Sequence, residues 1–332
     1  MVQDPDLERQ HWRSEERFND IDAQAARYHG YGQQYQQLSR GPFEGRFSSF
    51  QFGDDLAIYF EMANRELAQS ASTPRGRYGA CLMAAASPPC ALNAATFAQD
   101  QVVLCPANRS LEGKTSEGMS VYCLDVACEL LPDDGDNMQV VGVLTDAARS
   151  RELRELIQSG LATFTALGSI AGYPAAVRGF KSTLVDILWQ MAVQPGNNDL
   201  RKTRRYTSAR ALQVFRRARE YIHHGLTDGI SIVALCKEAG VSRRPLECAF
   251  RSVIGMGPGN YIRILQLNHI RRELMSDASA NLSIGVIAAR HGIWHWSRFS
   301  RYYRLLFGEL PSQTRLRYGR HCSPKYRAAR TA

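Results

Sequence analysis

The 332-residue sequence lacks the short motifs that mark common catalytic and nucleotide-binding sites. It contains no Gly-x-Ser-x-Gly, His-Glu-x-x-His, Walker A or Gly-x-Gly-x-x-Gly pattern, and no Cys-x-x-Cys pair. Cysteines stand at positions 81, 90, 105, 123, 128, 236, 248 and 322, with no tight four-cysteine cluster. We therefore expect neither an enzyme nor a protein that holds a metal or another cofactor.

Histidine is scarce in the first two-thirds of the chain, where only His11 and His29 precede residue 223. A metal site built on strands needs several such ligands, so none is expected there. A disulfide framework is also not expected, because no secretory context accompanies the cysteines. Most thiols are expected to be small buried apolar groups, with redox sensing as the less favoured alternative.

Long hydrophobic runs are missing as well. The first 18 residues are rich in charge and hold no apolar signal-peptide core. The most apolar stretch, Tyr78 to Ala98, is interrupted by Pro88, Pro89 and Asn93, so it is not a membrane span. These features predict a cytoplasmic protein that has no membrane partner.

Charge is distributed unevenly along the chain. Residues 201–332 contain 25 Lys or Arg and 7 Asp or Glu, a formal charge of +18, whereas residues 1–200 carry −9. So basic a region is typical of a nucleic-acid-binding domain. A solvated basic face or a membrane-surface patch is the alternative that composition alone leaves open.

Hydrophobic patterning divides the chain into segments. Residues 1–20 form a polar lead, and short apolar runs between turn residues over 46–127 predict strands of a sandwich or barrel. Helical periodicity predicts helices near 150–165 and 175–192. We place a sensing and dimerisation domain at 21–193, a linker at 194–208, a DNA-binding domain at 209–320 and a basic tail at 321–332.

Two features of the N-terminal domain leave alternatives open. Val177, Phe180, Leu184 and Leu188 form an apolar stripe that either pairs with a second copy in a homodimer or packs within its own chain. Aromatic residues of the strand region either line an effector pocket or fill the core. They are Phe47, Phe50, Phe52, Tyr59, Phe60 and Tyr122.

The C-terminal region contains an internal repeat. The segment 231–241 aligns with 283–293 at an offset of 52, and the offset becomes 53 after the turn. Leu246 then matches Phe299, and Phe250 matches Tyr303. Each copy reads as a helix, a glycine-containing turn and a second helix, which is the pattern of a helix-turn-helix unit.

The second helix of each copy has one apolar and one polar face. Leu246, Ala249, Phe250 and Val253 follow helical spacing in the first copy, as do Phe299, Tyr303 and Leu306 in the second. The opposite faces predict the base and phosphate contacts of two recognition helices. We expect DNA contacts from Arg243, Arg244, Glu247, Arg251, His295, Trp296, Ser297, Arg298, Arg301 and Arg304.

Residues 260–275, between the copies, read as one continuous helix that would hold the recognition helices apart. The order of Ser-Ile-x3-Cys-x3-Gly-Val-Ser, Gly-x2-Pro, this linker helix, a second unit and Phe307-Gly-Glu-Leu-Pro-Ser312 resembles the AraC/XylS DNA-binding domain. The form Gly292-Ile-Trp-His-Trp-Ser-Arg-Phe is similar to a broad branch that includes ethanolamine-utilisation regulators, and no effector is carried over from it. The resemblance covers roughly residues 212–318.

The resemblance implies an α+β protein with an N-terminal cupin-like β-barrel followed by helices and a C-terminal all-α domain of two helix-turn-helix units. It further implies a homodimeric transcription regulator, more often an activator, with promoter DNA, RNA polymerase and a small-molecule effector as partners. Two departures affect the first recognition helix. Cys248 stands where the family commonly has a basic residue, and Pro245 replaces the commoner Thr.

Two other functions compete with a sequence-specific regulator controlled by a small molecule. An architectural protein that coats DNA without reading its sequence would need only the positive charge. A regulator whose N-terminal domain binds another protein would share the same C-terminal motifs.

Overall fold

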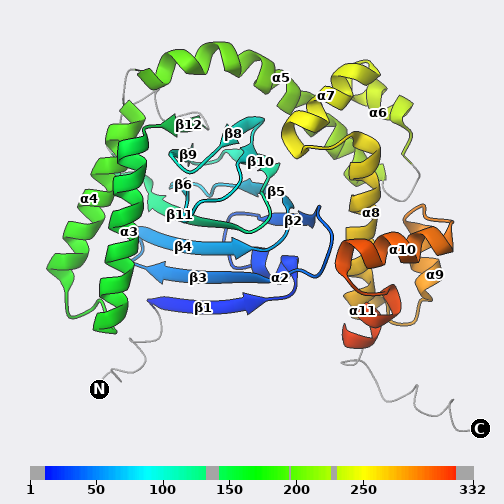
Figure 1. Cartoon of the computed structure of the whole chain (residues 1–332), viewed down its shortest axis with the longest axis horizontal. Helices are drawn as coiled ribbons and strands as arrows, with labels where there is room; N and C mark the ends of the chain where they lie inside the picture. Colours follow the sequence, from blue (N-terminus) through cyan, green and yellow to red (C-terminus); the bar gives the residue numbers. More distant parts are fainter. Residues whose placement is uncertain (1–11, 132–141, 194–195, 226–229, 319–332) are drawn as a thin grey trace, which may run out of the picture. The chain divides into compact units, whose positions relative to one another are not determined.

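The computed structural model describes residues 12–131, 142–193, 196–225 and 230–318, the side chains around 193–208 excepted. The chain divides into two compact units. The N-terminal unit comprises 1–35, 43–212 and 252–254, and the C-terminal unit comprises 36–42, 213–251 and 255–332. Figure 1 labels the elements of both units. The predicted basic tail at 321–332 lies outside the described residues.

Strands of the N-terminal unit form two sheets. The first has seven strands in the order β1(Arg13–Phe18), β3(Gly45–Gln51), β4(Leu56–Ala63), β11(Met119–Ala127), β6(Arg77–Met83), β9(Gln101–Cys105) and β12(Gly142–Thr145), all antiparallel. The second has five, in the order β2(Gln34–Gln37), β5(Leu67–Ser72), β10(Ser110–Lys114), β7(Cys90–Leu92) and β8(Ala95–Phe97).

The strands predicted between 46 and 127 are confirmed, but among the described residues the sheets do not close into one barrel. Alternation explains the two-sheet arrangement: on β9, Val102 and Leu104 join one hydrophobic cluster, whereas Val103 and Cys105 join another. A strand missed by sequence, β1, lies inside the predicted polar lead and pairs with β3. The Arg and Glu side chains of β1 give it no apolar pattern from which a strand could be predicted. A strand at the edge of a sheet tolerates such charge.

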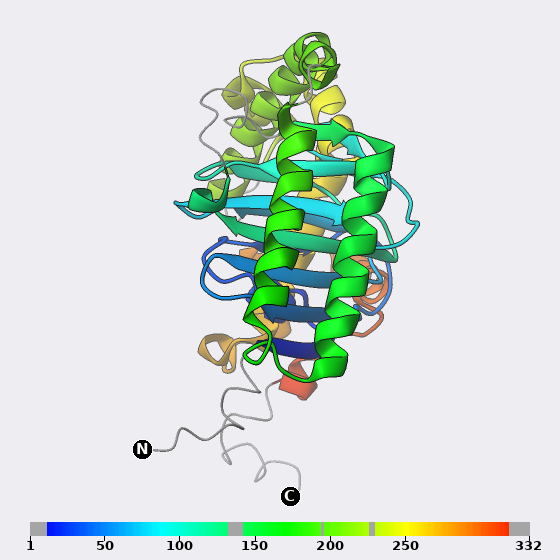
Figure 2. The same cartoon turned by 90° about the vertical axis from the view of Figure 1, so that its left-hand side faces the viewer.

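Helices α3(Ala147–Leu167) and α4(Pro174–Val193) cover one face of the seven-stranded sheet, as Figure 2 shows. Phe180, Leu184 and Leu188 of α4 are buried in one cluster with α3 and the sheet. The apolar stripe of α4 therefore packs within its own chain. A homodimer, if it forms, must use another surface.

The other face of the seven-stranded sheet packs toward the five-stranded sheet. Tyr35, Leu67 and Phe97 from β2, β5 and β8 share a buried cluster with Met83 and Val121 from β6 and β11. Short helix α2(Ile21–Ala25) begins at Asp20, whose carboxylate accepts the backbone N–H of Asp22 and Ala23. The 3-10 turns are Cys128–Leu130 and Asp277–Ser279.

The C-terminal unit is helical. Its elements are the C-terminal part of α5(Gly196–Gly225), then α6(Ile232–Ala239), α7(Arg243–Ile254), α8(Pro258–Met275), α9(Ile284–Arg290), α10(Trp296–Phe307) and α11(Pro311–Tyr318). The predicted linker at 194–208 is helical from Gly196 onward. Its Arg, Lys and Leu residues are good helix formers, so a helix follows the turn-like Pro-Gly-Asn-Asn sequence. No helix within the described residues is long and apolar enough to cross a bilayer.

Candidate nucleic-acid interface

The first helix-turn-helix unit consists of α6 and α7. The Ser231 hydroxyl accepts the backbone N–H of Ala234 at 3.0 Å and so caps α6. Gly240 ends α6 with φ +67°, a left-handed conformation that a side chain would strain. Ser242, the expected cap of α7, occupies the N-cap position but its hydroxyl makes no capping bond. The glycine turn therefore fixes the angle between the two helices.

The inner face of α7 is buried as its spacing predicts. Leu246, Ala249 and Phe250 are at most 2% exposed. The Phe250 ring lies 5.0 Å from that of Phe215 on α5 and 5.6 Å from that of Tyr261 on α8. This three-ring contact holds the first unit against the N-terminal end of the linker helix α8.

The outer face of α7 exposes Arg243, Arg244 and Arg251 together with the Cys248 thiol. Glu247 lies between two of these arginines. Its carboxylate is 3.0 Å from Arg243 Nε and 4.0 Å from Arg251 Nη2. One acidic group thus offsets part of the positive charge of the first recognition helix.

The second unit, α9 and α10, repeats this plan. The Ser283 hydroxyl accepts the Val286 N–H at 3.1 Å, and Gly292 makes the turn with φ +74°. Phe299, Tyr303 and Leu306 are at most 4% exposed. They form one cluster with Leu267, Ile270 and Leu274 of α8, so the second unit packs on the C-terminal half of the linker helix.

The outer face of α10 carries no acidic residue. His295, Ser297, Arg298, Arg301 and Arg304 are all exposed. Within the described part of the chain, none of these three arginines forms an ion pair, in contrast to Arg243 and Arg251 of α7. Their guanidinium groups are free to meet phosphate or guanine.

Trp296 has a structural role that the sequence did not reveal. Its ring is 47% exposed and packs edge-on to Phe299 at 6.3 Å. A Cβ atom at Gly285 of α9 would lie only 2.7 Å from this ring. The small residue on α9 therefore seats the indole between the two helices. A glycine in the first turn of a short helix was the available signal.

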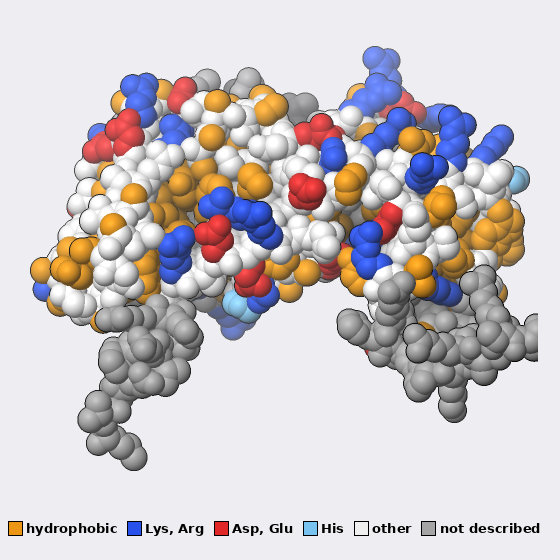
Figure 3. All heavy atoms as spheres, turned by 60° about the horizontal axis from the view of Figure 1, so that its bottom comes forward, with side chains coloured by type: hydrophobic (Ala, Val, Ile, Leu, Met, Phe, Trp, Pro, Cys, Tyr) orange, Lys and Arg blue, Asp and Glu red, His pale blue; other side chains and the backbone are white. Residues whose placement is uncertain are grey.

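Alignment of the two copies shows which residues of the second copy correspond to Pro245 and Cys248 of the first. At the offset of 53, Arg298 matches Pro245 and Arg301 matches Cys248, whereas Arg304 matches Arg251. The first recognition helix thus lacks two of the three arginines that the second presents. Figure 3 shows Lys and Arg side chains projecting from the C-terminal unit, with few acidic ones among them.

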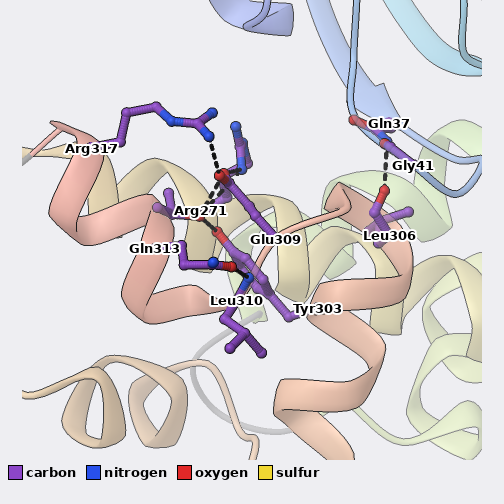
Figure 4. Close-up of polar contacts among 10 residues, drawn as sticks. Gln37, Gly41, Arg271, Tyr303, Leu306, Glu309, Leu310, Gln313 and Arg317 are labelled. Carbon is purple, nitrogen blue, oxygen red and sulfur yellow. Dashed lines mark hydrogen bonds and ion pairs between the residues drawn. The ribbon is translucent and has the colours of Figure 1, made fainter.

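The Phe-Gly-Glu-Leu-Pro segment closes the second unit, as Figure 4 shows. Glu309 is 8% exposed, and its carboxylate receives Arg271 of α8 at 2.6 Å and the Thr314 hydroxyl of α11 at 2.8 Å. Arg317 pairs with the other oxygen at 3.1 Å. This part of the motif acts as a structural clamp between α8 and α11.

Residues 36–42, from early in the sequence, belong to the C-terminal unit. The Gln37 N–H donates to Asn268 Oδ1 at 3.1 Å, and Asn268 Nδ2 donates to the Gln37 carbonyl at 3.2 Å. Gln37 Nε2 and the Gly41 N–H both donate to the Leu306 carbonyl, at 2.7 and 3.0 Å (Figure 4). The last carbonyls of a helix have no partner within it, so this segment caps α10.

Arg40 of this segment is an interface candidate that sequence reasoning missed. It is exposed and lines an open groove together with Arg301 and Arg304 of α10. Nothing in the sequence near position 40 indicates proximity to a helix that lies about 260 residues later.

A second candidate site lies between the two sheets of the N-terminal unit. It is a cavity of about 80 Å³, lined mostly by apolar side chains and by the thiols of Cys81, Cys90, Cys105 and Cys123. Of the aromatic residues expected around a pocket, Tyr59 lines this cavity. Phe50 and Phe52 instead pack in the cluster with α3 and α4.

Among the described residues that line this cavity, Glu61 is the one charged residue. It is 2% exposed and accepts hydrogen bonds from Tyr35 Oη at 2.6 Å, Gln24 Nε2 at 2.7 Å and Tyr28 Oη at 2.8 Å. Burial raises the pKa of the Glu61 carboxyl above its ordinary value, although these three donors oppose the rise. No group of metal-ligating side chains occurs among the described residues.

Two helix-turn-helix units on one linker helix, with arginine-rich outer faces, are the arrangement of a DNA-binding domain. Residues 235–317 match the family model described as a helix-turn-helix domain. Over these residues the chain is similar to transcription regulators of the AraC/XylS family.

Its relatives are similar over the C-terminal domain. The XylDLEGF operon transcriptional activator 3 of Pseudomonas putida is 39% identical over 111 residues, 33% of each chain. Regulatory protein HrpB of Ralstonia nicotianae is 33% identical over 108 residues, 32% of this chain and 23% of that protein. The aligned region thus spans about a third or less of these relatives. Among solved structures, the AraC-like transcriptional activator CuxR is 19% identical, with a TM-score of 0.42 over 83% of this chain and 100% of that one.

Proposed function

We propose that the protein is a sequence-specific regulator that inserts α7 and α10 into successive major-groove segments of its promoter. The observation that carries this proposal is the placement of the two units on opposite halves of α8. Its 18 residues give a helix of about 27 Å. Major-groove segments on one face of DNA recur every ~34 Å, which two offset recognition helices can match.

The second unit is proposed to supply more of the base specificity than the first. Arg298, Arg301 and Arg304 are exposed on α10 without acidic neighbours on that helix. On α7, Glu247 engages Arg243, and Cys248 replaces a basic residue. A guanidinium fork distinguishes guanine in the major groove, whereas a thiol offers only weak hydrogen bonds.

Selection of bound fragments tests this proposal. Genomic DNA captured by the full-length protein at about 150 mM salt should be enriched in a two-part motif, its parts about 10–10.5 base pairs apart. Within this motif, the bases read by α10 should vary less than the bases read by α7. Broad capture without a motif would instead favour the architectural alternative, whose affinity depends on salt and hardly on sequence.

The N-terminal unit is proposed to control this activity by binding a small molecule in the cavity between its sheets. Two facing antiparallel sheets are the arrangement of a cupin-like jelly roll, and such sandwiches hold ligands between their sheets. Occupancy would favour one of two conformations and so alter activation through RNA polymerase. Transcription from the selected promoter, with and without candidate effectors, tests this control.

Homodimerisation is proposed to add a second DNA-binding domain, because linked sites increase avidity. The apolar stripe of α4 is buried within the chain, which leaves exposed Leu167 and Tyr173 beside the turn between α3 and α4 as candidate contacts. Sedimentation of the full-length protein should show a dimer that Tyr173→Ser weakens. A monomer at micromolar concentration, binding DNA alone, would remove this part of the proposal.

A further inference from the structure

We propose that the cavity between the sheets takes a small organic ammonium cation with a short apolar body, held by Glu61. This inference deepens the proposed sensing role, on which it rests, by naming the chemical class of the ligand. It stands on the charge of the cavity wall, the rings around it and its size.

The charge of the wall excludes anions and favours cations. Of the residues that the structure describes, no Arg, Lys or His lines the cavity, so a carboxylate or phosphate ligand would meet Glu61 without any countercharge from them. No ion pair of Glu61 occurs within the described residues, although buried carboxylates are rarely left without a cation. An ammonium group supplies the missing charge.

The hydrogen bonds of Glu61 leave room for one more donor. An ionised carboxylate offers about four acceptor positions. Oε1 already receives Gln24 and Tyr35, whereas Oε2 receives only Tyr28. The unused position on Oε2 suits a ligand N–H, and the three protein donors hold the carboxylate in place for it.

The aromatic residues of the wall suit the same ligand. Tyr28, Tyr31 and Tyr59 all line the cavity, with ring centroids 6.1 Å apart for Tyr28 and Tyr31 and 5.3 Å apart for Tyr28 and Tyr59. Tyrosine rings attract cations through their negative faces. The thiols and aliphatic side chains of the wall accept an apolar body, and the polar side chains that also line it, Gln33, Gln69, Thr73 and Thr115, carry no charge.

The volume sets the length of the ligand. The cavity of about 80 Å³ is roughly half of the 150 Å³ of an engineered cavity that binds benzene. A body of about three carbon atoms therefore fits, and propylammonium is the natural probe. A ligand of four heavy atoms binds no more tightly than roughly tens of micromolar, so millimolar titrations are required.

A set of three isosteric probes tests the proposal on the full-length protein. Propylammonium, 1-propanol and propionate have nearly the same shape and differ in charge. We expect calorimetric or ligand-observed NMR titration at constant ionic strength to show propylammonium binding at least ten-fold more tightly than 1-propanol, with no binding of propionate. Equal or tighter binding of propionate would overturn the proposal.

Variants locate the binding. Glu61→Gln should remove the preference for the cation, whereas Glu112→Gln, which removes a buried carboxylate on β10 outside the cavity wall, should retain it. Gly79→Ala should weaken every probe, because a Cβ there reaches the cavity-lining Cys105 and Tyr31 at 3.7 and 3.8 Å without a clash. If Glu61→Gln does not fold, the probe series and Gly79→Ala still decide the matter.

The outcomes separate this inference from the proposed function. Cation binding in the cavity without any change in transcription would support the inference and contradict the sensing role of the N-terminal unit. DNA selection that yields the two-part motif, together with no cation preference, would sink the inference and leave the regulator intact.

Discussion

The two helix-turn-helix units have the same core but differ in how they are closed and in what they expose. The first is held to α8 by the rings of Phe215, Phe250 and Tyr261. The second is clamped by a buried ion pair between Glu309 and Arg271, at a position where the first copy has Met256. A repeated sequence therefore conserves the packing of a fold more strictly than the chemistry at its edges.

The largest effect is expected from a substitution that breaks the clamp of the second unit. Glu309→Gln leaves the Arg271 guanidinium buried without a countercharge, so we expect a loss of about 3–5 kcal/mol in the free energy of unfolding. Urea denaturation of the full-length protein measures it. The matched control is Arg317→Ala, which removes the exposed partner and should cost less than about 1 kcal/mol. Similar losses for both variants would show that the clamp is no more than a surface ion pair.

A second test asks whether α10 reads bases. Arg301→Ala should weaken binding to the selected promoter by about 1–3 kcal/mol and relax the preference at one base pair. Arg178→Ala, which removes an exposed arginine of α4, should leave binding unchanged. Fluorescence anisotropy on promoter variants gives the answer. A uniform loss on all sequences would make Arg301 a phosphate contact.

The converse substitution makes the first unit resemble the second. Cys248 occupies the position of Arg301, so Cys248→Arg should tighten DNA binding by less than about ten-fold at low salt. It should also steepen the salt dependence by about one released ion. Cys248→Ser is the neutral control. An unchanged salt slope would place residue 248 away from the DNA.

The smallest expected effect is on the loss of folding stability at low pH. In the second unit, Glu273 contacts His291 at 2.8 Å, whereas the first copy has Ala239 at the position of His291. Although burial acts to raise it, hydrogen bonds from His291, Ser279 and Arg290 lower the pKa of Glu273 below its ordinary 4.5. The folded state thus binds the proton less readily, so the stability that this group contributes is complete above pH 4.5 and is lost below it.

Glu273→Gln should therefore flatten the fall in stability below pH 4.5 and cost less than about 1 kcal/mol at neutral pH. Thermal melting between pH 3.5 and 7 checks both points, with Glu247→Gln on α7 as the matched variant in the first unit. An unaltered acid slope in Glu273→Gln would assign the loss to other carboxylates.

The sequence was sufficient where one periodicity governed a long segment. The repeat predicted the buried faces of α7 and α10, because apolar residues at helical spacing have only one way to avoid water. Short strands such as β3, β4, β9 and β11 were visible for the same reason. The DNA contacts stay predictions, since exposure alone does not tell a base contact from a phosphate contact.

Other features depended on contacts between distant residues. Glu61 was not singled out from the sequence, because only folding brings Tyr28, Tyr35 and Gln24 around it. A barrel was expected, but the structure has two sheets. Closure of a barrel depends on which strands pair at the edges, and the alternation of apolar residues does not specify that pairing. The helical course of 196–208 was missed because turn-forming residues at its start outweighed the helix formers that follow.

The capping segment 36–42 can reach its partners only late in synthesis on the ribosome. Gln37 is separated by 231 residues from Asn268 and by 269 residues from Leu306. At synthesis rates of about 5–20 residues per second, roughly 10 to 50 seconds pass between the emergence of Gln37 and that of its partners. During that interval Gln37 and its neighbours lack the hydrogen-bond partners that α8 and α10 provide in the folded unit. The C-terminal unit is thus completed by a segment made more than 200 residues before its partners.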